Sequence, residues 1–154
     1  MSWLTNQQLV HAVERAADPE TKQAFVGVFP VNRLPHSIPK PPIFIIMNTQ
    51  SHNLPGEHWK LIYISRQRVG EVFDSAGLIP NVTLQQWMNT FCITWSFTTR
   101  VYQNPMSGTC GAYVLYVLLN RLHSLTLSRV LSPFTNSLVA NDSFVRKFYD
   151  TISQ

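Results

Sequence analysis

The sequence predicts an α+β fold in which a small, mostly antiparallel sheet packs on one central buried helix, with further helices at its flanks. The helix is predicted from an apolar run of helical length that starts at Cys110 and ends near Leu122, because a helix that is apolar on every side must be buried. The sheet is predicted from short segments rich in β-branched and aromatic residues, such as Ile43–Met47. The combination places the helix in the core with the sheet against it.

The remaining elements follow from capping, turn and periodicity signals. Thr5–Gln8 forms a capping box that starts a helix reaching Asp18-Pro19. Half of the ten prolines fall between Pro30 and Pro42, which predicts an extended, non-helical segment. The other expected elements are a strand at residues 25–31, two hairpin strands at His58–Ser65 and Val69–Asp74, a helix capped by Thr83 that ends at Phe91, a strand at residues 93–102, and a helix at Asp142–Ile152 capped by Asn141.

Composition fits one globular domain that covers residues 1–154. Hydrophobic residues make up 45% of the chain and charged residues 13%, and a chain of this length buries about two-thirds of its unfolded surface. The longest apolar run, Ala112–Leu119, is much shorter than the ~20 residues of a membrane helix, so no membrane span is expected. Glu14 and Arg15 interrupt the segment where a signal peptide would be apolar, so we expect an intracellular protein.

The two cysteines, Cys92 and Cys110, argue against a disulfide scaffold and against a zinc site. Neither belongs to a Cys-x-x-Cys pair, and no histidine and cysteine have the spacing of metal ligands. We expect no metal and no small-molecule cofactor. The formal charge of +4 favours contact with polyanions such as DNA, although the lysines and arginines are scattered as on an ordinary solvated surface.

Cys110 is the candidate nucleophile. It lies in Ser107-Gly108-Thr109-Cys110-Gly111 at the start of the predicted buried helix, where unpaired N–H groups and the helix dipole stabilise an anion. Gly111 beside it allows another chain to approach closely. A lone cysteine is more often a small buried hydrophobic residue, but this position favours a functional thiolate.

His58 and Asp74 are the candidate base and orienting acid, which a thiolate nucleophile of a protease requires. They flank a predicted hairpin whose loop is Ser65-Arg66-Gln67. In that register Ile64 pairs with Arg68. His58 then stands opposite Asp74 on the same face of the sheet. A lone histidine in a strand is more often structural, and a register change of one residue would remove the match.

Gln103 is the candidate oxyanion donor. It ends a predicted strand and precedes Cys110 by seven residues. Its side-chain amide can therefore direct an N–H at the oxyanion that forms when the thiolate attacks a carbonyl. By itself a glutamine at a strand end is usually polar surface, so this assignment depends on the other residues.

In this order, the residues resemble the adenovirus protease (adenain) branch of the cysteine proteases, the superfamily that also includes the SUMO-specific proteases. The similar segments, which extend over about residues 20–125, are Gly27–Pro30, Ile46–Thr49, His58-Trp59, Val72–Gly77, Cys92–Thr94 and the pair Gln103 and Cys110-Gly111. The resemblance implies His58 as base, Asp74 as acid, Cys110 as nucleophile and Gln103 as oxyanion donor. It also implies that Trp59 flanks the base, where an indole face can hold an imidazolium, although a core-packing tryptophan is the equal alternative.

The resemblance further implies a viral role. The family cleaves viral precursor proteins after glycine in short motifs and is activated by a peptide and by DNA. We therefore expect capsid or core precursors as substrates, an activating peptide and non-specific DNA as partners, and the virion and host cell nucleus as locations, in a divergent virus or virus-like element. Cys92 resembles the adenain cysteine that forms a disulfide with the activating peptide, although a small buried hydrophobic residue is an equal alternative.

The sequence departs from adenain in three ways, and two other functions stay open. The acid is Asp where many adenovirus enzymes have Glu, the hairpin is slightly shorter, and the C-terminal region is reduced. One alternative is a deconjugating protease for a ubiquitin-like modifier of the SUMO type, which uses the same chemistry. The other is a catalytically silent capsid- or DNA-binding module that has kept the fold.

Overall fold

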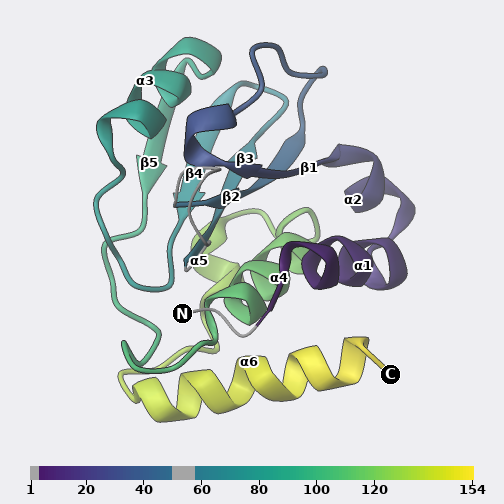
Figure 1. Ribbon diagram of the computed structural model, residues 1–154, viewed down its shortest axis with the longest axis vertical. Coiled ribbons are helices and arrows are strands. Elements are labelled where there is room, and N and C mark those ends of the chain that lie inside the picture. The colour runs from purple at the N-terminus through teal and green to yellow at the C-terminus, as the bar shows by residue number, and fades with distance from the viewer. Residues whose placement is uncertain (1–3, 50–57) are drawn as a thin grey trace.

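A five-stranded sheet with the strand order β1-β2-β3-β4-β5 forms the centre of the computed structural model (Figure 1). The structure describes residues 4–49 and 58–154. The strands are β1 at Phe25–Pro30, β2 at Ile43–Asn48, β3 at Trp59–Ile64, β4 at Val69–Phe73 and β5 at Thr94–Phe97. The helices are α1 at Asn6–Ala16, α2 at Pro19–Ala24, α3 at Val82–Phe91, α4 at Cys110–Arg121, α5 at Leu127–Val130 and α6 at Leu138–Ile152, with a 3₁₀ turn, η1, at Val31–Arg33.

The α+β class is confirmed, but the antiparallel pairing is confined to the middle of the sheet. Strand β3 pairs antiparallel with β2 and with β4, whereas β1 runs parallel to β2 and β5 runs parallel to β4. The reason lies in the connections, because parallel neighbours need a long crossover. The proline-rich residues 31–42 form one crossover, and residues 74–93, which contain α3, form the other.

Alternate residues of β2 and β3 enter two separate cores, one on each face of the sheet. Phe44, Ile46, Leu61 and Tyr63 pack in the core that includes α1 and α4. The residues between them pack in the other core, under α3 and η1; they are Ile43, Ile45, Met47, Ile62 and Ile64. Because both faces are covered, β2 reads as a continuous apolar run with no alternation.

Helix α4 is buried against the sheet, as the sequence predicts, and α6 covers its other side. It packs directly on β3 on one side and on α6 on the other (Figure 1). Residues 110–118 are all buried, which is the arrangement that an all-round apolar helix requires. Its first residue, Cys110, is thereby held at one end of the sheet.

The predicted N-cap is correct for helix α1 and wrong for helix α3. The predicted capping box of α1 is present, with Thr5 and Gln8 bonding to each other's backbone N–H. Helix α3 is capped by Asn81, whose side chain accepts the N–H of Leu84, so the prediction of Thr83 as its cap was wrong.

Helix α6 starts four residues earlier than predicted. Ser137 caps it by accepting the N–H of Ala140. The predicted cap, Asn141, lies inside the helix and is buried. The strand predicted at residues 93–102 is also shorter, since β5 covers only Thr94–Phe97. Within the described ranges 4–49 and 58–154, no helix is both long and apolar enough to cross a bilayer.

Candidate active site

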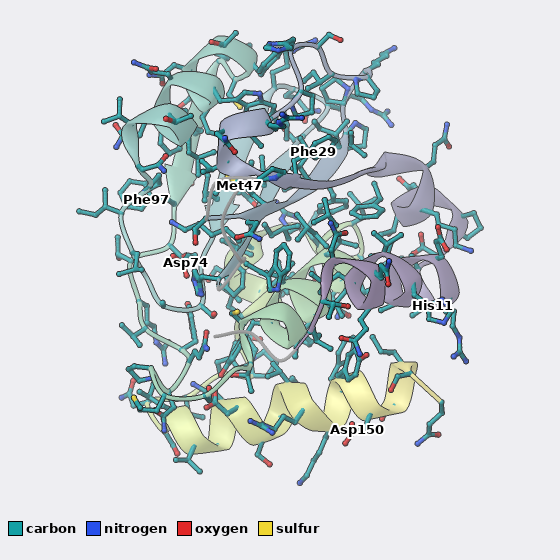
Figure 2. All side chains as sticks on the ribbon, viewed as in Figure 1. His11, Phe29, Met47, Asp74, Phe97 and Asp150 are labelled. Carbon is teal, nitrogen blue, oxygen red and sulfur yellow. The ribbon has the colours of Figure 1, made fainter. Side chains whose placement is uncertain are left out.

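Three elements bring His58, Asp74 and Cys110 to one end of the sheet. His58 immediately precedes β3, and Asp74 immediately follows β4. Because β3 and β4 are antiparallel neighbours, the start of one lies beside the end of the other. Helix α4 packs on β3 and begins with Cys110. Figure 2 marks Asp74 at this end of the sheet.

The β3–β4 hairpin reaches this arrangement in a register two residues away from the predicted one. Ile64 pairs with Gly70, not with Arg68. The turn is longer than expected, because Arg68 adopts a left-handed conformation with φ 62° and its N–H returns to the carbonyl of Ser65 at 2.8 Å. A shift of two residues preserves the face of every side chain. The expected contact between His58 and Asp74 therefore survives the wrong register.

His58 contacts both of its predicted partners. Its Nε2 lies 2.5 Å from Oδ1 of Asp74, which leaves Nδ1 as the ring nitrogen available to the thiol. Burial alone would lower the pKa of His58. Hydrogen bonds and charge interactions with Asp74 and Cys110 outweigh burial and raise the pKa to about 9. The imidazole is thus held as a cation at neutral pH beside a carboxylate and a sulfur atom.

Asp74 is a buried carboxylate whose two oxygens are both occupied. Oδ1 accepts from His58 and from the N–H of Ala76 at 2.8 Å, and Oδ2 lies 3.2 Å from the ammonium nitrogen of Lys60. Burial would raise the pKa of Asp74, but His58, Lys60 and the Ala76 N–H hold it below its usual range. The carboxylate is therefore ionised although the side chain is only 1% exposed.

The turn after Asp74 requires a glycine. Gly77 has φ +68°, and its N–H donates to the Asp74 carbonyl at 3.0 Å. A Cβ at this position would lie 2.6 Å from the carbonyl oxygen of Thr99. Both the left-handed backbone and this close approach exclude other residues. The turn in this form carries the backbone N–H that bonds to Oδ1 of Asp74.

Cys110 opens α4 where the usual side-chain cap is lacking. The N-cap residue is Thr109, whose hydroxyl makes no capping bond and instead contacts Ser107 and Asp142. The start of the helix keeps its dipole directed at the Cys110 region. Cys110 is 1% exposed. Leu4 packs over the adjacent Gly111, where a Cβ would lie 3.1 Å from the leucine side chain.

Gln103 is fixed by hydrogen bonds at both ends of its amide. Its Oε1 accepts from the Ser75 hydroxyl at 2.6 Å, and its Nε2 donates to the carbonyl of Ser107 at 2.9 Å. Ser75 follows Asp74, and Ser107 lies in the loop before Cys110. The amide therefore joins the two segments that carry the acid and the cysteine. Within the described part of the chain this amide nitrogen has one acceptor for its two N–H hydrogens, and the role of Gln103 as oxyanion donor stays a prediction.

Two charged residues beside the predicted site, Asp142 and Lys60, were not predicted from the sequence to belong to it. Asp142, expected at the start of a helix, is buried and accepts from the hydroxyls of Tyr113 and Thr109 at 2.7 and 3.1 Å. Burial and Asp142 together raise the pKa of Tyr113. These bonds fasten α6 to the start of α4. Lys60 was also missed, although a lysine in the apolar strand Trp59–Ile64 is a readable sign of a buried charge.

The contacts of Trp59 and Cys92 bear on the two alternatives predicted for each residue, a functional contact or a buried packing residue. The indole of Trp59 packs in the core with α4 and donates its N–H to the carbonyl of Leu4 at 3.1 Å, which favours the core-packing alternative. Cys92 lies away from Cys110, half-buried, with its sulfur against Gly70 of β4. Burial raises the pKa of the Cys92 thiol.

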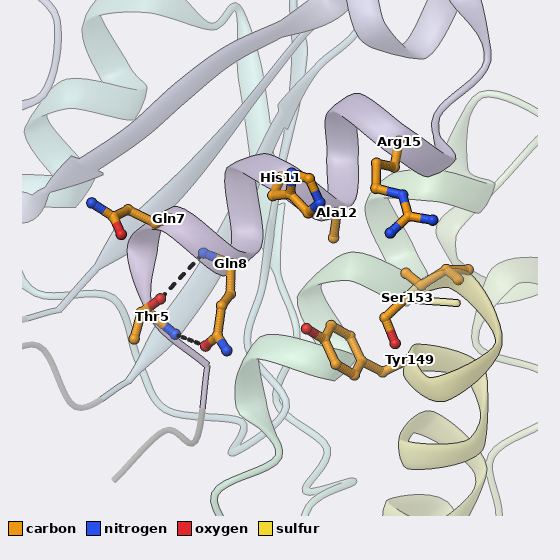
Figure 3. Close-up of a pocket in the computed structure, with 9 residues that line it drawn as sticks. Thr5, Gln7, Gln8, His11, Ala12, Arg15, Tyr149 and Ser153 are labelled. Atoms are coloured by element: carbon orange, nitrogen blue, oxygen red, sulfur yellow. Dashed lines mark hydrogen bonds between the residues drawn. The ribbon is translucent and has the colours of Figure 1, made fainter.

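Two other features of the described residues lie apart from this cluster. Within residues 4–49 and 58–154, no group of three or more His, Cys, Asp or Glu side chains is placed to hold a metal ion. A groove of about 540 Å³ runs between α1 and the end of α6, lined by Thr5, His11, Arg15 and Tyr149 among others (Figure 3). It contains none of the four predicted catalytic residues.

Solved structures with this fold include a viral protease. The chain superposes on the ASFV pS273R protease with a TM-score of 0.62 and 18% identity, over 92% of this chain and 64% of that one. For a selenomethionine crystal form of the same protease, the TM-score is 0.53 and the identity 22%, over 69% and 42% of the two chains. The chain thus spans less than two-thirds of the length of these structures. The likeness shows that the chain shares the fold of this protease, in agreement with the predicted fold class.

Sequence comparisons add nothing to this likeness. A scan against protein-family models and a search of curated protein sequences find no match to the chain. The fold is therefore established by structure alone, and the roles of the individual side chains rest on their chemistry.

The raised pKa of His58 predicts a pH-dependent stability. Folding raises the pKa from 6.5 to about 9, so the protonated imidazole stabilises the folded state fully below about pH 6.5. This contribution is lost as the pH rises through about 9. We expect the difference in unfolding free energy between the protein and His58→Gln to fall by about 3 kcal/mol from pH 6 to pH 10, measured by urea denaturation.

The control for this prediction is the same pair of proteins carrying Asp74→Asn. Without the carboxylate that holds the imidazolium, the change between pH 6 and pH 10 should be much smaller. Stability curves of the protein and of His58→Gln that run parallel across this range would contradict the assignment of a raised pKa to His58.

Proposed function

We propose that this protein is a cysteine endopeptidase in which Cys110 is the nucleophile, His58 the base, Asp74 the orienting acid and Gln103 the oxyanion donor. The observation that carries the proposal is that the fold brings Cys110, His58 and Asp74 together: His58 bonds to Asp74 and lies near enough to Cys110 for both residues to raise its pKa. This is the relationship that a thiol protease needs, with the base between the nucleophile and an acid. The shared fold with a viral protease supports it.

The first half of the reaction forms a thioester. In the resting pair the proton of Cys110 already lies on His58, so the thiolate attacks the carbonyl carbon of the scissile bond to give a tetrahedral oxyanion. The imidazolium then donates that proton to the leaving nitrogen, the C–N bond breaks and the amine departs. Asp74 keeps the ring oriented and stabilises its positive charge throughout.

The second half releases the acid product. Water enters, His58 takes one of its protons, and the hydroxide attacks the thioester carbonyl. The second oxyanion collapses and the C–S bond breaks, which restores the thiolate of Cys110 beside the imidazolium of His58. At both oxyanions a donor is required. The proposed donor is the amide of Gln103, which hydrogen bonds to Ser75 and Ser107 hold in place.

The proposed substrates are viral precursor proteins cut after glycine, in the virion or the host cell nucleus. This part rests on the resemblance to adenain and on the viral origin of a structural neighbour. Glycine-containing peptides and SUMO conjugates are the substrates to compare. Preference for the conjugates would favour the deconjugating alternative, and inertness toward both would favour a silent binding module.

An activating peptide is proposed at the edge of the sheet, next to Cys92. Strand β5 is the last strand in the sheet order, and within residues 4–49 and 58–154 its one strand partner is β4. Ile93 is 81% exposed and Phe97, which Figure 2 places at the margin of the molecule, is 36% exposed. An extended peptide can add to such an edge by backbone pairing, and a disulfide to Cys92 would tether it. The charge of +4 supports a proposed DNA cofactor.

Removing the proposed nucleophile or base should abolish peptide hydrolysis without unfolding the protein. We expect Cys110→Ala and His58→Ala to lose detectable turnover of a glycine-containing fluorogenic peptide, whereas Asp74→Asn keeps residual activity because Asp74 transfers no proton. Circular dichroism checks the fold of each variant, and Cys92→Ser is the matched cysteine control. Hydrolysis that persists in Cys110→Ala would refute the proposed function.

Gln103→Ala should lower kcat about 10²-fold with a smaller change in KM, because one oxyanion donor acts mainly in the transition state. Ser75→Ala is the control: it frees the Gln103 oxygen but keeps the N–H donor, so its loss of kcat should be smaller. If Gln103→Ala raised KM and left kcat unchanged, Gln103 would be a substrate contact.

Cys92→Ser should weaken activation by a cysteine-bearing peptide but not by the same peptide with serine in place of its cysteine. The physical reason is that only the first peptide can form the tethering disulfide. The measurement is the increase in turnover with peptide concentration under mildly oxidising conditions. Native Cys92 that resists thiol labelling until the protein unfolds would rule out the tether.

A further inference from the structure

Lys60 is a charged residue in a fully buried strand. It lies in β3, opposite Met47 of β2, and is 4% exposed. Its neighbours Trp59 and Leu61 point into the core beneath α4. A lysine is almost never buried unless it is paired, because an isolated ammonium group loses its hydration. Such a position therefore implies a specific anionic partner.

The partner of Lys60 is the carboxylate that also holds His58. The Lys60 ammonium lies 3.2 Å from Oδ2 of Asp74, while Nε2 of His58 lies 2.5 Å from Oδ1. One buried carboxylate thus serves two cations, one at each oxygen. Among the described residues, Cys110 at the start of α4 also acts on His58.

We propose that Lys60 is a positioning residue that shares Asp74 with His58 and so limits how tightly the carboxylate can hold the imidazolium proton. It acts through its ion pair with Asp74. The proposal deepens the protease assignment and rests on it for the kinetic consequence only. The charge sharing itself follows from the two distances to Asp74.

Lys60 has two effects on the proposed reaction cycle. When His58 gives up its proton, Asp74 would otherwise be a buried charge without a cation, and Lys60 keeps it neutralised. When His58 is protonated, the second positive charge disfavours the imidazolium, since like charges near one another destabilise the charged form. Lys60 therefore makes His58 a better proton donor to the leaving amine than an isolated His–Asp pair would be.

The titration of His58 tests the proposal directly. In a Cys110→Ala background, which removes the thiol, ¹³C-labelled histidine is followed by NMR from pH 5 to pH 11. Lys60→Met and Lys60→Gln should each raise the titration midpoint of His58 by about one pH unit, because a positive charge is lost near the ring. Lys60→Arg keeps the charge and should leave the midpoint within a few tenths of a unit.

A lysine that only holds Asp74 in place predicts the opposite change in the His58 titration midpoint. If Lys60 only supported the position of Asp74, its loss would loosen the His58–Asp74 bond and lower the midpoint. An unchanged or lowered midpoint in Lys60→Met and Lys60→Gln would therefore overturn the proposal.

Thermal stability gives an independent test of the ion pair between Lys60 and Asp74. Asp74→Asn leaves Lys60 buried without its anion and should lower Tm strongly, while Lys60→Met added to Asp74→Asn should recover most of the loss. If the double variant is as unstable as Asp74→Asn alone, Lys60 and Asp74 are not energetically coupled, and the charge sharing is wrong.

Kinetics separate this proposal from the proposed function. In the protein with Cys110 intact, Lys60→Met should move the alkaline limb of kcat/KM upward by about the shift seen in the titration. A shifted His58 titration in a protein that hydrolyses no peptide would support the charge sharing and contradict the protease assignment. Normal hydrolysis with an unshifted His58 titration and an unshifted alkaline limb would support the protease assignment and contradict the charge sharing.

Discussion

The burial of α4 is the constraint on which the rest of the structure depends. A helix that is apolar on every side can be stable only if every side is covered, and here β3, α1 and α6 cover it. This packing fixes the first residue, Cys110, at one end of the sheet. The start of β3 and the end of β4 meet at the same end, so the fold places a histidine, an acid and a cysteine together.

Buried polar groups then fix how these side chains stand. Asp74 is held by two cations and by the backbone N–H of Ala76. Asp142 of α6 is held by the hydroxyl groups of Tyr113 and Thr109, which lie at the start of α4. Gln103 joins the acid segment to the cysteine loop. Because unpaired buried groups are costly, each network resists rearrangement and keeps the site preorganised.

The sequence could predict those parts of the site that depend on local patterns. The buried helix and its first residue follow from the apolar run alone, and the face shared by His58 and Asp74 follows from alternation. The hairpin register was missed because it depends on the left-handed backbone of Arg68. The parallel outer strands were missed because a crossover leaves no local signal in either strand.

The hydrogen-bond and ion-pair partners of the side chains could not be predicted from local sequence patterns. Asn141 and Asp142 have the composition of a helix cap, yet they lie within α6 and bond to the loop before α4. Ser75 and Gln103 are 28 residues apart, and only the folded chain brings them into contact. Lys60 could have been recognised as a buried charge, but its anion could not have been named before the hairpin was placed.

The pH dependence of alkylation at Cys110 tests most directly whether the cysteine and the histidine act as one unit. In a Cys92→Ser background, the rate of iodoacetamide labelling at Cys110 is measured from pH 5 to pH 10, with and without His58→Gln. A thiolate paired with the His58 imidazolium predicts substantial labelling well below the ordinary thiol midpoint of about 8.5, and His58→Gln should return the curve to that midpoint. Identical curves for the two proteins would contradict the account.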